Sequence, residues 1–149
     1  MLFALILIPL LAAVAILVGS PARLTALIAA ALNLGISIYV AFTWSCSCWE
    51  TPGFQVLENP NINLSLGLTG ISTVMLLLST IITLAAVYSG KCPEGREKLW
   101  FSSTLFIATG AIGAFLSTDV FFFYAFHELA LIPTFLMIGM LGRGDRKAA

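Results

Sequence analysis

Five long apolar runs dominate the pattern of hydrophobic and polar positions along the chain, and the short stretches between them hold nearly all of the charges. Each run approaches the roughly 20 apolar residues that a transmembrane helix needs, and a helix satisfies every backbone group in lipid. We therefore predict an all-α membrane protein with five transmembrane helices. They form a single membrane domain over residues 1–149, with helices at about 2–18, 24–43, 66–88, 99–118 and 120–141.

Two other interpretations of the runs are weaker. Strands of a membrane barrel are about 10 residues long and alternate polar with apolar side chains, which these runs do not. The first run, Leu2 to Val18, is longer than the usual apolar core of a signal peptide, and no basic residue precedes it. It therefore predicts a true first helix or an uncleaved anchor.

Composition agrees with a bilayer as the solvent. Hydrophobic residues make up 60% of the chain and charged residues 9%, whereas soluble domains are near a quarter charged. These figures exclude a soluble enzyme, a disordered linker and a coiled coil, and the lack of basic clusters excludes a nucleic-acid binder. Three cysteines make neither a disulfide framework nor a complete zinc site, and we assign no role to Cys46 and Cys48.

The basic residues predict an orientation. One follows the first run, three lie between the third and fourth, and three follow the fifth: Arg23; Lys91, Arg96, Lys98; Arg143, Arg146, Lys147. With five spans, all of them fall on one side of the membrane. The positive-inside rule makes that side cytoplasmic, so the N-terminus is predicted outside and the C-terminus inside.

An acidic residue within the fifth run is the main candidate for chemistry. Glu128 lies eight residues after Val120, which is about 12 Å into a helix that rises 1.5 Å per residue. An acidic side chain at the centre of a membrane helix costs about 2.5–3.5 kcal/mol on insertion. Such residues usually face a protein interior or a wet cavity and mark ion or proton routes. We favour that role over a protonated structural glutamate.

Three neighbours of Glu128 are secondary candidates. Tyr124, four residues earlier, shares its face, so the hydroxyl is placed either to hydrogen-bond the carboxyl or to fill space. His127 points about 100° away, and we favour a packed side chain over a proton relay. Pro133 cannot donate to the carbonyl of Leu129, which predicts a kink beside Glu128. Broken helices beside buried charge are common in transporters, although membrane helices also simply tolerate proline.

Weaker signals lie elsewhere in the chain. Gly110, Gly113 and Ala114 give the fourth run a small-residue face that favours close helix packing. Asn33, the most polar side chain of the second run, either hydrogen-bonds across helices or has no special role. Asp119 is expected to cap the fifth helix, where the helix dipole favours an anion.

The segment 121–142 carries a resemblance to a known family. Its aromatic run, Glu128, four apolar residues and Pro133 resemble the fifth helix of the antiporter-like membrane subunits of respiratory complex I, of the type called subunit M in bacteria and subunit 4 in mitochondria. The stretch from Leu66 to Ser72 resembles that family's G-x-D-G-I-S motif, with Thr69 in place of the aspartate. The order of predicted elements also fits.

The resemblance implies an activity and partners. In the family, electron transfer in a peripheral arm drives proton movement through the membrane subunits, and the glutamate that matches Glu128 pairs with a lysine on a later helix. The chain thus resembles a proton-translocating subunit of NADH:quinone oxidoreductase in a bacterial inner membrane or an equivalent energy-transducing membrane. Its implied partners are the other membrane subunits, the later helices of the same subunit and the lipid bilayer. NADH, FMN, iron–sulfur clusters and quinone are implied for partner subunits, with no cofactor and no redox catalytic site on this chain.

Two alternatives stay open beside this interpretation. The nearer is the homologous subunit of a multisubunit sodium/proton antiporter or of a membrane-bound hydrogenase. The other is a small helical scaffold or assembly protein, against which Glu128 argues because a scaffold has little reason to bear its insertion cost. Because the family continues beyond the matched region, we expect a fragment, a split-gene product or a truncated sequence.

Overall fold

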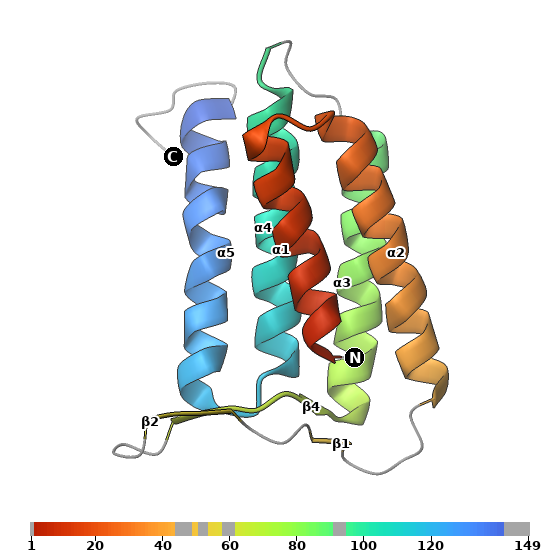
Figure 1. Ribbon diagram of the computed structural model, residues 1–149, viewed down its shortest axis with the longest axis vertical. Coiled ribbons are helices and arrows are strands. Elements are labelled where there is room, and N and C mark those ends of the chain that lie inside the picture. The colour runs from red at the N-terminus through yellow and green to blue at the C-terminus, as the bar shows by residue number, and fades with distance from the viewer. Residues whose placement is uncertain (1, 44–48, 51–53, 58–61, 91–94, 142–149) are drawn as a thin grey trace.

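A bundle of helices forms the molecule in the computed structural model, which describes residues 2–43, 49–50, 54–57, 62–90 and 95–141. Neighbouring helices along the chain run in opposite directions, side by side (Figure 1). The five helices of the described residues are α1 (Leu2–Val18), α2 (Ala22–Thr43), α3 (Gly70–Ser89), α4 (Glu97–Leu116) and α5 (Val120–Leu141). The predicted all-helical architecture of five helices is therefore confirmed. Four helices, α2 to α5, are long and apolar enough to cross a bilayer, whereas α1 is apolar but has only 17 residues.

Short strands between α2 and α3 were not predicted. They are β1 (Trp49–Glu50), β2 (Phe54–Leu57), β3 (Ile62–Leu64) and β4 (Gly67–Leu68). β1 pairs with β4 and β2 pairs with β3, both antiparallel, so each pair is a small two-stranded sheet. The strands lie at the end of the bundle where α2 ends and α3 begins (Figure 1).

The predicted ends of three helices need correction. α3 begins at Gly70 rather than 66, because Leu66 pairs with Ser117 in an antiparallel bridge and the next residues form β4. The start is capped by Thr69, whose Oγ1 accepts a hydrogen bond from the N–H of Ser72 at 3.2 Å. α4 spans 97–116 rather than 99–118, since Ser117 is extended, and α2 begins at 22 rather than 24.

The core is built around α4, the most buried of the long helices, which contacts α1, α2, α3 and α5. The buried apolar side chains of the core form two separate clusters. The Phe101 cluster lies toward the end where α4 begins and contains Ala12, Ala13, Ile16, Ala22, Ala26, Ala29, Ala30, Val87, Phe101 and Leu105. The Leu116 cluster lies toward the strands and contains Leu2, Leu5, Ile6, Val40, Leu66, Leu68, Leu76, Ile112 and Leu116.

The described basic residues gather at one end of the bundle. Arg23 lies in the first turn of α2, and Arg96 and Lys98 lie at the start of α4. Both helices begin at the end opposite the strands (Figure 1). There Arg96 Nη1 donates a hydrogen bond to the carbonyl of Met140, in the last turn of α5, where a cation complements the helix dipole. The remaining basic residues lie outside the described part of the chain.

Candidate functional site on helix α5

The start of α5 is fixed by Asp119. Its Oδ1 accepts a hydrogen bond from the N–H of Phe121 at 2.8 Å, and its carbonyl accepts one from the N–H of Phe123 at 2.9 Å. A carboxylate at this position satisfies a free N–H and complements the positive end of the helix dipole. The predicted capping role of Asp119 is confirmed.

One face of α5 packs against the small residues of α4. A β-carbon added to Gly110 would lie 2.6 Å from the carbonyl oxygen of Phe126 and 2.8 Å from Ala130 Cβ, and one added to Gly113 would overlap the Phe126 ring. Pro133, further along α5, is also buried. The predicted close packing at the small-residue face of α4 is therefore confirmed, and it sets the rotation of α5 about its own axis.

Glu128 consequently points away from α4. It is two residues from both Phe126 and Ala130, and two residues on a helix differ by about 200°. The Glu128 side chain is half-buried, whereas the side chains around it on this face are more exposed: Phe121 55%, Tyr124 62%, Leu131 46%, Phe135 75% and Ile138 49%. We call this stripe, with Glu128 near its middle, the outer face of α5. No described helix covers it.

The polar neighbour of Glu128 on the outer face is Tyr124. It lies one helical turn before Glu128. The two residues share a face, as their spacing of four predicts. Within the described residues Glu128 makes no ion pair.

His127 lies to one side of this pair. Its ring stacks on that of Phe123, with centroids 6.5 Å apart and planes 15° from parallel. The side chain is exposed and points to a different face from Glu128, as expected for consecutive helix residues. The structure thus gives His127 a packing contact and does not bring it together with Glu128 and Tyr124.

Pro133 lies inside α5, which continues unbroken to Leu141. Proline has no N–H, so the carbonyl of Leu129 lacks its usual helix donor one turn after Tyr124 and next to Glu128. The following residue, Thr134, donates its hydroxyl to the carbonyl of Ala130 at 2.7 Å. Pro133 lies on the side of α5 that packs against α4, about 140° around the helix from Glu128.

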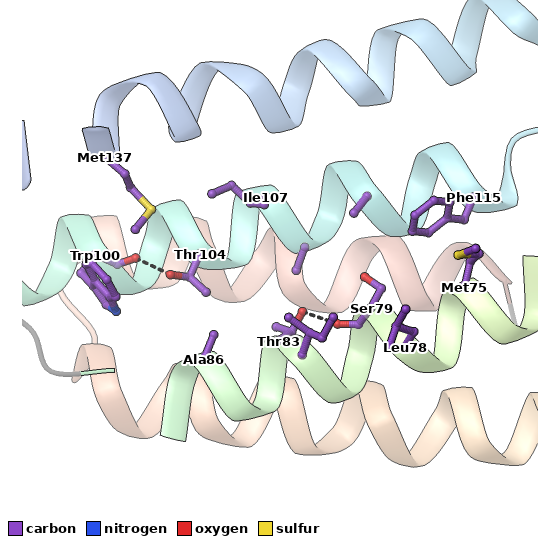
Figure 2. A pocket seen from close by; sticks show the side chains of 13 residues that line it. Met75, Leu78, Ser79, Thr83, Ala86, Trp100, Thr104, Ile107, Phe115 and Met137 are labelled. Carbon is purple, nitrogen blue, oxygen red and sulfur yellow. Dashed lines mark hydrogen bonds between the residues drawn. The ribbon is translucent and has the colours of Figure 1, made fainter. Parts of the chain in front are cut away.

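A separate hollow lies on the other side of α4. It is an apolar groove of about 440 Å³ between α3 and α4 with Met137 of α5 at its edge, and neither Glu128 nor Tyr124 lines it. In Figure 2, Thr83 and Thr104 project into it from the two helices, each turned back to hydrogen-bond a carbonyl of its own helix, Ser79 and Trp100 respectively. Since these hydroxyl protons are used within the helices, the groove offers an apolar surface.

Among the described residues, neither cysteines nor a metal cluster adds to the site on α5. Cys46 and Cys48 lie outside the described residues. Within the described residues, no group of three or more His, Cys, Asp or Glu side chains is placed to hold a metal ion.

Comparison with known proteins gives a consistent family. The chain is 34% identical over 152 residues to NADH-ubiquinone oxidoreductase chain 4 of Marchantia polymorpha, an alignment that covers 96% of this chain and 31% of that protein. It is 33% identical over 99 residues to NADH-quinone oxidoreductase subunit M of Rhodobacter capsulatus, covering 64% of this chain and 19% of that protein. No protein-family model matches the chain.

Solved structures share the fold. A chain of respiratory complex I from Thermus thermophilus with bound NADH superposes with a TM-score of 0.86 at 23% identity, covering 99% of this chain and 31% of that chain. A chain of the archaeal membrane-bound sulfane sulfur reductase gives a TM-score of 0.76 at 19% identity, covering 97% and 23%. By sequence, the chain is a homologue of the membrane subunits called chain 4, or subunit M, of NADH-quinone oxidoreductase, and it spans about a third of their length.

Proposed function

We propose that this chain serves in a membrane subunit of a proton-pumping NADH:quinone oxidoreductase and that Glu128 takes part in proton translocation. The observation that carries the proposal is the position of Glu128 near the middle of the outer face of α5, which no described helix covers. A carboxyl at that depth is costly unless protein or water surrounds it. The relatives are about three times as long as this chain or more, so they contain further segments that are available to cover the face.

The partner expected for Glu128 is a basic side chain from such a segment. Two ionisable groups that lie close together in a low-dielectric site titrate as a coupled pair. When one partner moves away or changes its charge, the free energy of protonating the other changes too. Making and breaking the pair therefore moves a proton, provided that a redox-driven change elsewhere in the complex shifts the geometry.

The neighbours of Glu128 support this role in different ways. Tyr124 shares the face of Glu128 one turn away, where a hydrogen bond to the carboxyl would hold it in one orientation. Pro133 leaves the Leu129 carbonyl without its helix donor, one residue along the chain from Glu128. His127, which stacks on Phe123, is assigned a packing role.

The proposal includes the partners of the chain, the cofactors of the complex and the membrane in which it lies. Its partners are the other membrane subunits of the complex, the remaining helices of the same subunit and the surrounding lipid. NADH, FMN, the iron–sulfur clusters and the quinone are assigned to partner subunits. The membrane is a bacterial inner membrane or an equivalent energy-transducing membrane, and the relatives come from both bacteria and plants.

We further propose that the N-terminus lies outside and the C-terminus on the cytoplasmic or equivalent side. Arg23, Arg96 and Lys98 lie at the end of the bundle opposite the strands. Short loops rich in Lys and Arg stay on the cytoplasmic side during insertion.

The alternatives are less well supported. The relatives reported above carry the names of NADH-quinone or NADH-ubiquinone oxidoreductases, which favours this enzyme over a sodium/proton antiporter or a membrane-bound hydrogenase. A scaffold without a transport role gains nothing from a carboxyl in the middle of a membrane-spanning helix.

The test is substitution of Glu128 in the assembled complex, with NADH-driven proton uptake measured in membrane vesicles at matched complex levels. Glu128→Gln keeps the shape and removes the charge, so we expect intact assembly with a strong loss of proton uptake and of coupled quinone reduction. Glu128→Asp should keep part of the activity, and Glu128→Ala should resemble Glu128→Gln. Normal proton uptake in Glu128→Gln would leave a structural glutamate only.

A matched control is Glu97→Gln, which makes the same chemical change in the exposed first turn of α4. We expect it to pump protons as the parent does. If Glu97→Gln lowered proton uptake as much as Glu128→Gln, the loss would reflect charge removal in general and would contradict a specific role for Glu128.

A further inference from the structure

The core of the bundle turns from apolar to polar at half depth. The Phe101 cluster and the Leu116 cluster are separate, and on each of four helices at least one polar residue or a proline is buried between them. We choose one such residue on each helix and call the four the mid-depth layer: Pro9 on α1, Asn33 on α2, Thr80 on α3 and Thr109 on α4. The layer lies on the inner surfaces of the bundle, away from the outer face of α5.

Asn33 is the unusual member of this layer. Its side chain is only 3% exposed, and its Oδ1 is sealed from the surface without any hydrogen-bond partner. A buried amide oxygen without a partner costs free energy, and such groups are rare in folded proteins. This free-energy cost is no smaller in a bilayer, since lipid offers no hydrogen-bond donor. Oδ1 therefore requires a donor that the described protein atoms do not supply.

The nearest polar groups to Asn33 along its face cannot be that donor. Ser37, one turn further along α2, shares the face of Asn33, and its Oγ lies 3.0 Å from Thr80 Oγ1 on α3. Ser37 Oγ also lies 2.8 Å from the carbonyl of Leu34, and Thr80 Oγ1 lies 3.1 Å from that of Leu76. Each hydroxyl carries one proton, so both protons are used between these groups. Their remaining lone pairs, however, are free to accept.

A second acceptor lies on α1. Pro9 is buried and has no N–H, so the carbonyl of Leu5, whose side chain is fully buried, lacks its helix donor. The carbonyl of Leu5 is thus a second acceptor without its helix donor, on a helix that packs against α2. The shortage is one of donors, which identifies the chemistry of the missing ligand.

We propose that the mid-depth layer binds an internal water molecule, which donates one hydrogen to Asn33 Oδ1 and the other to a lone pair of the Ser37–Thr80 hydroxyl pair. Buried waters typically make about three hydrogen bonds to otherwise unsatisfied polar groups. A side chain from another subunit cannot reach Oδ1, because the rest of this chain already encloses it. A cation is a poor fit, because the layer holds no carboxylate among the described residues and its need is for a donor.

The water would hold α2 and α3 in one register at half depth. Interhelical hydrogen bonds and small residues, rather than hydrophobic burial, drive association of helices in lipid. The site is independent of Glu128, which lies on the outer face of α5, so the inference does not rest on the proposed function.

The first test is a density map of the assembled complex that resolves other buried waters. We expect a water peak about 2.7–3.2 Å from Asn33 Oδ1 and within the same range of the Ser37 or Thr80 hydroxyl. In Asn33→Leu, which has similar volume and no polar atom, the peak should vanish. A direct protein donor at Oδ1, or no peak in a map that shows comparable waters, would overturn the proposal. A peak whose occupancy depends on replacing Na⁺ by choline would assign a cation instead of water.

The second test uses thermal stability, which does not require a map. If Oδ1 is truly unsatisfied, Asn33→Leu removes an unfavourable group and raises the melting temperature of the complex. If it binds water, Asn33→Leu lowers the melting temperature, and we expect this result. Thr80→Val should also lower it, whereas Thr83→Val, the same change on α3 at a hydroxyl that bonds only Ser79 of its own helix, should have a smaller effect. Equal effects of the two threonine variants, or a rise in Asn33→Leu, contradict the proposal.

Discussion

Gly110 on α4 and Ala130 on α5 approach so closely that a β-carbon on Gly110 would lie 2.8 Å from Ala130 Cβ. The two backbones can approach this closely only because the side chain of Gly110 is a hydrogen atom and that of Ala130 is a methyl group. It also decides where Glu128 points, since Glu128 lies about 200° around α5 from Ala130. A packing detail on one side of the helix therefore directs the carboxyl on the other.

Enlarging Gly110 should separate α4 from α5. We expect Gly110→Val to destabilise the subunit by about 1–3 kcal/mol, as overpacking does, and to reduce the amount of assembled complex. The control is Gly35→Val, the same change on α2 where no atom lies within 4 Å of the added β-carbon. Complex levels measured by native gel should fall for Gly110→Val alone. Equal levels for both variants would show that the α4–α5 contact tolerates a larger spacing.

Tyr124 and His127 should differ in their effect on proton uptake. A hydrogen bond to a charged group contributes about 1.5–3 kcal/mol. Tyr124 shares the face of Glu128 one turn away, so loss of such a bond in Tyr124→Phe should lower proton uptake by roughly ten- to a hundredfold on that figure, and by less than Glu128→Gln does. His127→Ala removes only a ring contact with Phe123 and should be milder still. NADH-driven uptake in vesicles at matched complex levels gives the order, and a larger loss in His127→Ala than in Tyr124→Phe would instead assign His127 to the proton route.

Hydrophobic runs predict the helices of this fold well because lipid requires an uninterrupted apolar segment, and no soluble surface complicates the pattern. They predict helix ends less well. Leu66 and Leu68 continue the apolar run before α3, yet they belong to a bridge and a strand whose side chains are fully buried. Two apolar residues fit a short buried strand as well as the first turn of a helix, so periodicity alone does not separate a strand from a helix here.

The residues of the site also divide into those that the sequence predicts and those that it does not. Glu128 is evident from sequence because a carboxyl in an apolar run is costly, and the glycines of α4 are evident because membrane helices use them to pack. The polar pair of Ser37 and Thr80 was not predicted, because serine and threonine often bond their own helix and so give no sign of a partner on another one. The spacing of four between Asn33 and Ser37 is the signal that was available.

Thr69 gives a prediction about the start of α3. Its Oγ1 accepts from the N–H of Ser72, which is the bond that an aspartate at this position would also make. Thr69→Ala should therefore destabilise the subunit by about 1 kcal/mol, whereas Thr69→Asp should preserve stability. Thermal denaturation of the complex measures both. A drop of similar size in Thr69→Asp would mean that the surroundings of the cap disfavour a charge there.

The orientation of the bundle yields the last prediction. The strands follow α2, and the basic start of α4 lies at the opposite end, so the two ends should face opposite sides of the membrane (Figure 1). After replacement of the native cysteines by serine, Gln55→Cys in β2 and Glu97→Cys in α4 provide one probe for each end. A membrane-impermeant thiol reagent applied from the outside should label position 55 and not position 97, and inverted vesicles should give the reverse, because loops rich in Lys and Arg are retained on the cytoplasmic side. Labelling of position 97 from outside would reverse the orientation, and labelling of both positions from the same side would contradict a membrane crossing by α3, the helix between them.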